Sequence, residues 1–166
     1  MNGAYWHIAT NHIPVIAMPF IFFLLLGGVL RKSPDLIKAS YIASIVVALI
    51  TIFVWKTGGP AAHVLKNHPE IQVQRADIHE HAEAADFGLW SCEIVGALAL
   101  IGLWLRRREN RLSWWPWLVV VVSLWSSTVL ARVAHLGGLI RHSEISSAPA
   151  PTPGDAPPAS PSTNHP

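Results

Sequence analysis

The side chains in this sequence with the greatest capacity for chemistry are its nine histidines. They are His7, His12, His63, His68, His79, His81, His135, His142 and His165. Most of them come just before or just inside long hydrophobic segments that lie far apart in the chain. If those segments are helices of one bundle, these histidines meet at one end of it. Because imidazole is the commonest metal ligand and also binds haem iron, the arrangement predicts a metal or haem site there.

The leading interpretation is a non-covalent b-type haem held by two histidines, which gives a low-spin iron suited to electron transfer. We expect His12 and His81 to ligate one iron, and His63 and His135 to form a second pair. Arg132, inside the last hydrophobic segment, would neutralise a haem propionate. The chain has no Cys-x-x-Cys-His motif, so the covalent c-type attachment that uses this motif is excluded.

Two alternatives stay open. The first is a copper or zinc site formed by His79, His81, His63 and Glu83, with a role in metal transport or storage. The run His79-Glu80-His81 does not form a His-Glu-x-x-His motif, so a zinc protease is not supported. The second is a non-catalytic subunit of a larger membrane complex, in which the histidines cap helices or lie in interfaces.

Hydrophobic helices must position these side chains. The chain of 166 residues is 51% hydrophobic and 13% charged, with a mean hydropathy of +0.37, whereas a soluble domain is about one-quarter charged. A bilayer core needs about 20 mostly apolar residues per helix, and helices satisfy the backbone there. Four segments qualify, at about 13–30, 39–55, 84–105 and 114–140. The predicted fold is therefore an all-α, integral membrane four-helix bundle over residues 1–145.

The remaining composition narrows the class of protein further. The proline-rich segment 146–166 cannot bury a core, so it is predicted to be a disordered tail. The single cysteine, Cys92, cannot form an internal disulfide. A soluble globular enzyme, a coiled coil and a disulfide-stapled secreted domain are excluded.

Lysine and arginine predict the orientation of the helices. One side carries three of them after the first segment and four after the third: Arg31, Lys32, Lys38, Arg106, Arg107, Arg108 and Arg111. The other side carries fewer: Lys56, Lys66, Arg75 and Arg141. Since basic loops stay on the cytoplasmic side, both termini are expected outside. Topology explains these basic loops, so we do not interpret them as nucleic-acid-binding.

The third segment carries two rows of residues at helical spacing, on nearly opposite faces. One row is His79, Glu83, Asp86, Trp90 and Glu93, and the other is His81, Ala85, Gly88, Cys92 and Ala99. The acidic row suits a hard cation, a proton route or an ion pair, the simplest being Arg132 with Asp86 or Glu93 inside the membrane. The small residues of the second row leave room either for a flat macrocycle or for close helix packing.

Short motifs at three helix ends carry a resemblance. His12-Ile13-Pro14-Val15 enters the first segment, Thr57-Gly58-Gly59-Pro60-Ala61 follows the second, and Ile78-His79-Glu80-His81-Ala82-Glu83-Ala84-Ala85 enters the third. Over residues 5–140 or so, the chain resembles a family of small bacterial four-helix membrane proteins known only as a domain of unknown function. That family shows a histidine and a proline at the first helix, a Thr-Gly turn after the second and a histidine before the third.

The resemblance implies haem binding, or a role beside redox enzymes, in the bacterial inner membrane. The outer end would then be periplasmic, and the partners would be lipid and other membrane or periplasmic redox proteins. This chain departs from the family pattern in having Ile13 between His12 and Pro14, and in having two histidines, His79 and His81, before the third segment.

Overall fold

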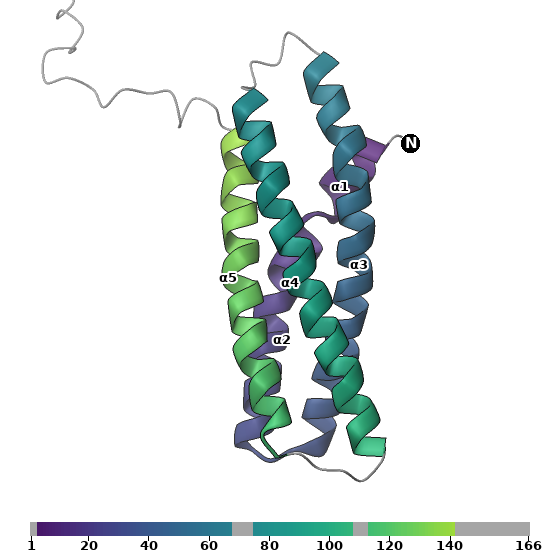
Figure 1. Ribbon diagram of the computed structural model, residues 1–166, viewed down its shortest axis with the longest axis vertical. Helices are drawn as coiled ribbons and strands as arrows, with labels where there is room; N and C mark the ends of the chain where they lie inside the picture. Colours follow the sequence, from purple (N-terminus) through teal and green to yellow (C-terminus); the bar gives the residue numbers. More distant parts are fainter. Residues whose placement is uncertain (1–2, 68–74, 108–112, 142–166) are drawn as a thin grey trace, which may run out of the picture.

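The computed structural model describes residues 3–67, 75–107 and 113–141, and these are almost entirely helical (Figure 1). The helices are α1 (Gly3–Thr10), α2 (His12–Leu30), α3 (Pro34–Asn67), α4 (Arg75–Arg107) and α5 (Trp115–Arg141). The segment 146–166, with the predicted disordered tail, lies outside the described residues, as do His68, His142 and His165. The predicted all-α fold is confirmed for the described parts of the chain.

Four helical segments are long and apolar enough to cross a membrane, as the sequence predicts. They are Gly3–Leu30, in which α1 and α2 follow one another, Pro34–Asn67, Arg75–Arg107 and Trp115–Ile140. Their outward faces carry large apolar side chains, among them Ile16, Phe87 and Trp90, which are 68%, 69% and 66% exposed. A soluble protein rarely exposes apolar surface on this scale, so the surface suits contact with lipid.

Consecutive helices pack side by side, and α5 closes the ring against α2. Within this up-and-down ring α2 lies diagonal to α4, and α3 lies diagonal to α5. The short α1 bends away from α2 at Asn11 and packs along the part of α3 that includes Val54, Thr57 and Pro60 (Figure 1). The start of α1 and the end of α5 lie toward the same end of the bundle, which we call the histidine end because His7, His63, His79, His81 and His135 lie there.

The two long helices extend beyond the predicted segments. α3 has 34 residues and α4 has 33, which makes each about 50 Å long, against a hydrocarbon core of about 30 Å. Most of the excess lies at the histidine end, in residues 56–67 and 75–83. The predicted Thr-Gly turn at Thr57 and Gly58 is wrong, because α3 continues through Pro60 to Asn67. α1 packs on this part of α3, with Gly3 against the Pro60 ring, so tertiary packing overrides the local preference for a turn.

The inward face of α4 is built of small residues that let neighbouring helices approach. A Cβ on Gly96 would lie 2.7 Å from Ala48 Cβ on α3, and one on Gly102 would lie 2.5 Å from the Tyr41 ring. On the other side, a Cβ on Gly88 would lie 3.2 Å from Val133 of α5. The sequence left two roles open for these small residues, room for a flat macrocycle or close helix packing. Along this stretch of α4 the structure shows close helix packing.

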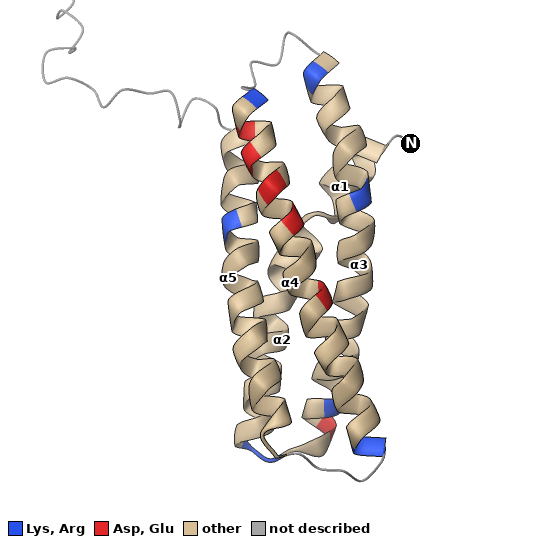
Figure 2. Cartoon of the chain, viewed as in Figure 1, with Lys and Arg blue, Asp and Glu red and all other residues tan. Residues whose placement is uncertain are grey.

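Charged residues separate along the bundle axis (Figure 2). Among the described residues, one end carries Arg31, Lys32, Lys38, Arg106 and Arg107, with Asp35 as its one acidic residue. The histidine end carries most of the acidic residues, in a row on α4. Between the two ends lies a long band in which Glu93 is the one charged residue among those described.

Candidate functional site

Two histidines at the histidine end, His7 and His81, are half-buried, while the other described histidines are exposed. α1 places the His7 ring against α3, where Nδ1 lies 3.1 Å from the Val54 carbonyl oxygen and 3.3 Å from Thr57 Oγ1. α4 places the His81 ring against α5, where Nδ1 lies 3.1 Å from the Val133 carbonyl oxygen. Each ring is therefore oriented by the backbone of a neighbouring helix.

These hydrogen bonds fix the tautomer of both imidazoles. A carbonyl oxygen only accepts, so the Nδ1 atom of His7 donates to Val54 and that of His81 donates to Val133. In the neutral rings Nε2 then carries the free lone pair. Metal-ligating histidines have this arrangement, because a second hydrogen bond to a carbonyl or carboxylate sets the ring orientation and raises the basicity of the ligand nitrogen.

His7 and His81 belong to the same end of the bundle and affect one another electrostatically. A positive charge on His7 disfavours a positive charge on His81. Each ring lies beside a glycine of the helix that orients it. A Cβ on Gly58 would be 3.6 Å from His7 Cε1, and one on Gly137 would be 3.1 Å from His81 Cε1. The pair is thus framed by two positions that have no side chain.

Two buried oxygen atoms near this pair take no hydrogen bond among the described residues. They are Oδ2 of Asp77 and Oδ1 of Asn11. Asp77 is one helical turn from His81 on the same face of α4, and Asn11 follows His7 by four residues at the bend between α1 and α2. Buried polar atoms without a partner are uncommon, and they mark places where a ligand or water binds.

The structure does not bring His12 to His81. His12 is exposed at the start of α2, in a shallow groove of about 430 Å³ with Ile13, Ile16, Ala17 and Phe20. This face of α2 is opposite to its buried residues, which include Met18 and Leu25. No hydrogen bond or ion pair in the described parts of the chain joins His12 to another residue, whereas His7 is half-buried and acts electrostatically on His81.

The predicted second pair is not brought together either. His63 is exposed near the end of α3, where its ring lies 3.1 Å from the Asn67 amide nitrogen one turn further along the helix. His135 is exposed on α5, the helix diagonal to α3. Neither shares a contact with the other among the described residues.

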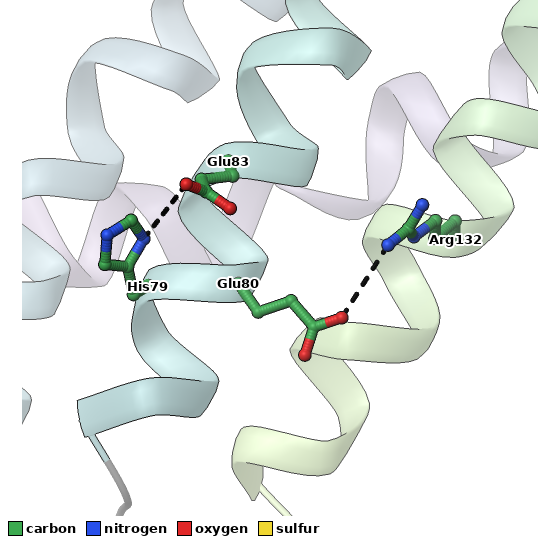
Figure 3. A network of polar contacts seen from close by, with 4 residues as sticks. All are labelled: His79, Glu80, Glu83 and Arg132. Atoms are coloured by element: carbon green, nitrogen blue, oxygen red, sulfur yellow. Dashed lines mark ion pairs between the residues drawn. The ribbon is translucent and has the colours of Figure 1, made fainter.

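The residues of the copper or zinc alternative are also divided between faces. His79 Nδ1 lies 3.6 Å from Glu83 Oε1, and both side chains are exposed (Figure 3). His81 points to the opposite side of α4, toward α5, and His63 bonds only its neighbour Asn67. In residues 3–67, 75–107 and 113–141, no three side chains of the histidine, cysteine, aspartate or glutamate type form a cluster that could hold a metal ion.

Arg132 pairs with a different acid from those predicted. Its guanidinium lies 3.7 Å from Glu80 Oε1, with side chains 71% and 57% exposed (Figure 3). The predicted pairing with Asp86 or Glu93 is wrong because the His81–Val133 bond sets the level of α4 against α5, which puts Glu80 beside Arg132. Asp86 lies six residues beyond Glu80 on α4, toward the basic end, and instead accepts a 2.6 Å hydrogen bond from Trp55 Nε1.

His7 was the residue that the sequence-based choice of ligands left out. The predicted first span begins at residue 13, whereas helix starts at Gly3. The sequence does indicate this earlier start of the helix, because Ala4, Tyr5 and Trp6, just before His7, are already apolar. The bend at Asn11, which directs α1 onto α3, has no comparable signal.

Comparison of the chain with protein-family models, with curated proteins and with solved structures finds no match.

Proposed function

We propose that this chain is a multi-pass membrane protein that binds a b-type haem between His7 and His81 and transfers electrons at its outer end. The observation that carries the proposal is the shared geometry of the two rings, each with Nδ1–H on a backbone carbonyl and Nε2 free. Haem suits this pair better than a bare copper or zinc ion, because haem requires only two protein ligands. A bare ion ordinarily needs three or four.

The haem would supply one-electron transfer at a low-spin iron with two imidazole ligands. The protein would hold the two imidazole rings in place through their hydrogen bonds to the Val54 and Val133 carbonyl oxygens. Gly58 and Gly137 present no side chain beside the rings, so each imidazole packs directly against the backbone of the neighbouring helix. Arg132 is exposed toward the same end, within reach of solvent-facing carboxylates such as propionates.

We place the histidine end outside and the basic end in the cytoplasm, with both termini outside. The positive-inside rule supports this orientation, since the loops at the basic end hold most of the lysine and arginine residues. In a bacterial inner membrane the site would face the periplasm, where membrane-bound or periplasmic redox proteins are its partners.

An optical spectrum of the detergent-purified protein tests the proposed cofactor. We expect a Soret band and a reduced-minus-oxidised α band in the wild type, and loss of both in His7→Ala and His81→Ala. Matched controls are His12→Ala, His63→Ala and His135→Ala, which replace exposed histidines and should keep the bands. If His12→Ala abolishes the bands and His7→Ala keeps them, the ligand pair is the one predicted from sequence.

Two other outcomes would overturn the haem proposal. A colourless protein that retains copper or zinc in stoichiometric amount supports a metal-binding role. A protein with neither cofactor that co-purifies with other membrane proteins supports a non-catalytic subunit.

A further inference from the structure

Glu93 is the one charged residue of α4 between Asp86 and Arg106, and Figure 2 shows an acidic position within the otherwise uncharged middle of this helix. It lies seven residues below Asp86, which is about 10 Å along the helix axis, and thirteen residues above Arg106, which is about 20 Å. Its neighbours Trp90 and Ile94 are 66% and 42% exposed and apolar, as lipid-facing side chains are. If α4 crosses the membrane as proposed above, Glu93 lies at hydrocarbon depth.

The environment of Glu93 does not compensate a negative charge. Its Oε1 atom is buried and takes no hydrogen bond from the described residues. Ionised side chains at this depth are costly and are normally paired with a cation or a backbone group. An isolated buried carboxyl group relieves that cost by keeping its proton.

No cation from the packed neighbours lies at the level of Glu93. α4 packs against α3 and α5. The charged and titratable side chains of those two helices lie toward the two ends: Lys56, His63 and Lys66 with Arg132 and His135 at the histidine end, and Asp35, Lys38 and Tyr41 at the basic end. On α4 itself, Cys92 is adjacent but is packed in the core beside Ser126.

We propose that Glu93 is a proton-binding site inside the membrane, held as the neutral carboxylic acid and reached from the histidine end. This proposal uses the membrane-spanning part of the proposed function but not the haem. The acidic row of α4 supplies the access, because Asp86 and Glu83 lie on the same face as Glu93 and lead from its depth to water. Trp55 Nε1 and His79 Nδ1 hold these two carboxylates in place.

A hydrophobic carbodiimide tests the protonation state directly. Dicyclohexylcarbodiimide reacts with the acid form of a carboxyl group: the acid proton moves to a carbodiimide nitrogen and the carboxylate oxygen bonds to the central carbon. The acyl group then shifts to nitrogen and leaves a stable N-acylurea, with no leaving group and no oxidant. Intact-mass and peptide analysis of the full-length protein in lipid vesicles should show one adduct, on Glu93.

Matched variants separate this result from labelling of any acid on α4. Glu93→Gln should lose the adduct, and Glu80→Gln, which removes an exposed acid of α4 outside that row, should keep it. A water-soluble carbodiimide with an added amine should modify the exposed Glu80 and Glu83 and spare Glu93. The proposal is overturned if Glu93 stays unmodified while other acids react, or if Glu93 reacts equally with the water-soluble reagent.

Infrared spectroscopy gives a second measurement that does not depend on reagent access. The wild type should show a carbonyl stretch of a protonated carboxyl group near neutral pH, and Glu93→Gln should lose that band. In vesicles of one orientation, raising the pH on the histidine side alone should slow the labelling. A band that is the same in both proteins, or a rate that responds only to pH on the basic side, contradicts the proposal.

Discussion

The imidazole of His81 rests on the backbone of Gly137, so that a Cβ at position 137 would lie 3.1 Å from Cε1 and 3.4 Å from Nδ1 of the ring. The same Nδ1 donates to the Val133 carbonyl one helical turn earlier on α5. The absent side chain at position 137 and the carbonyl of Val133 together determine where the ring of His81 lies.

Gly137→Ala should displace His81. The added methyl group would be closer to the ring than an ordinary contact, so the ring must move and the bond to Val133 lengthens. We expect loss of the slowly exchanging Nδ1–H signal of His81 in NMR spectra of the histidine-¹⁵N protein, and a weakened haem band if haem is bound.

The control for this prediction is Gly138→Ala. A Cβ on Gly138 meets nothing within 4 Å. The substitution should leave His81 unchanged and stabilise α5 by up to about 1 kcal/mol, since alanine has the higher helix propensity. Equal behaviour of the two alanine variants would show that Gly137 does not position the ring.

Gly96→Ala should destabilise the contact between α3 and α4. Its Cβ would lie 2.7 Å from Ala48 Cβ, and overpacking of this kind costs about 1–3 kcal/mol. Adding Ala48→Gly moves the methyl group from one helix to the other and should recover most of the loss. Unfolding in detergent of the wild type, both single variants and the double variant measures the coupling. Additive effects of the two substitutions would contradict the close contact.

The overall fold could be predicted from the sequence because each helix that crosses a lipid bilayer needs a run of about 20 mostly apolar residues. Four apolar runs separated by basic or acidic loops predict four helices, and four helices of the expected kind are found. It was less informative about helix ends. Residues 56–67 and 75–83 carry polar side chains and still continue α3 and α4. The added part of α3 packs against α1, and the added part of α4 packs against α5.

The candidate site shows the same limit more sharply. Helical spacing put His81 on the small-residue face of its segment, and there the structure finds it, beside Gly137. Spacing could not choose between His7 and His12 as neighbours of His81. That choice depends on the bend at Asn11, which directs α1 onto α3 and leaves His12 on an outward face.

Ser91 and Ser126 form a hydrogen bond between α4 and α5, at 2.9 Å, inside the core. Ser91 Oγ donates to the Gly88 carbonyl, so Ser126 is the donor to Ser91. A double-mutant cycle with Ser91→Ala and Ser126→Ala should give a coupling of about 0.6 kcal/mol, the average for such pairs in membrane proteins. A coupling near zero would mean that Ser126 finds another acceptor, for which Cys92, 3.7 Å away, is the nearest candidate.

Single cysteines should report the orientation of the bundle. Cys92 is fully buried, so Cys92→Ser gives a background without thiols at little risk of new surface effects. In spheroplasts, a membrane-impermeant maleimide should label His63→Cys at the histidine end and should label Ser33→Cys, between α2 and α3, only after permeabilisation. The reverse pattern would place the basic end outside and contradict the orientation proposed here.

Arg132→Gln should have little effect on stability. The pair with Glu80 is 3.7 Å long, and both side chains are mostly exposed, at 71% and 57%. Exposed pairs of this kind contribute about 0–1 kcal/mol, whereas removing one partner of a buried pair costs about 3–5 kcal/mol. The unfolding free energy of Arg132→Gln and Glu80→Gln, measured at low and high salt, should therefore stay within about 1 kcal/mol of the wild type. A loss several times larger would show that Arg132 is buried against a carboxylate, as the sequence alone led us to expect.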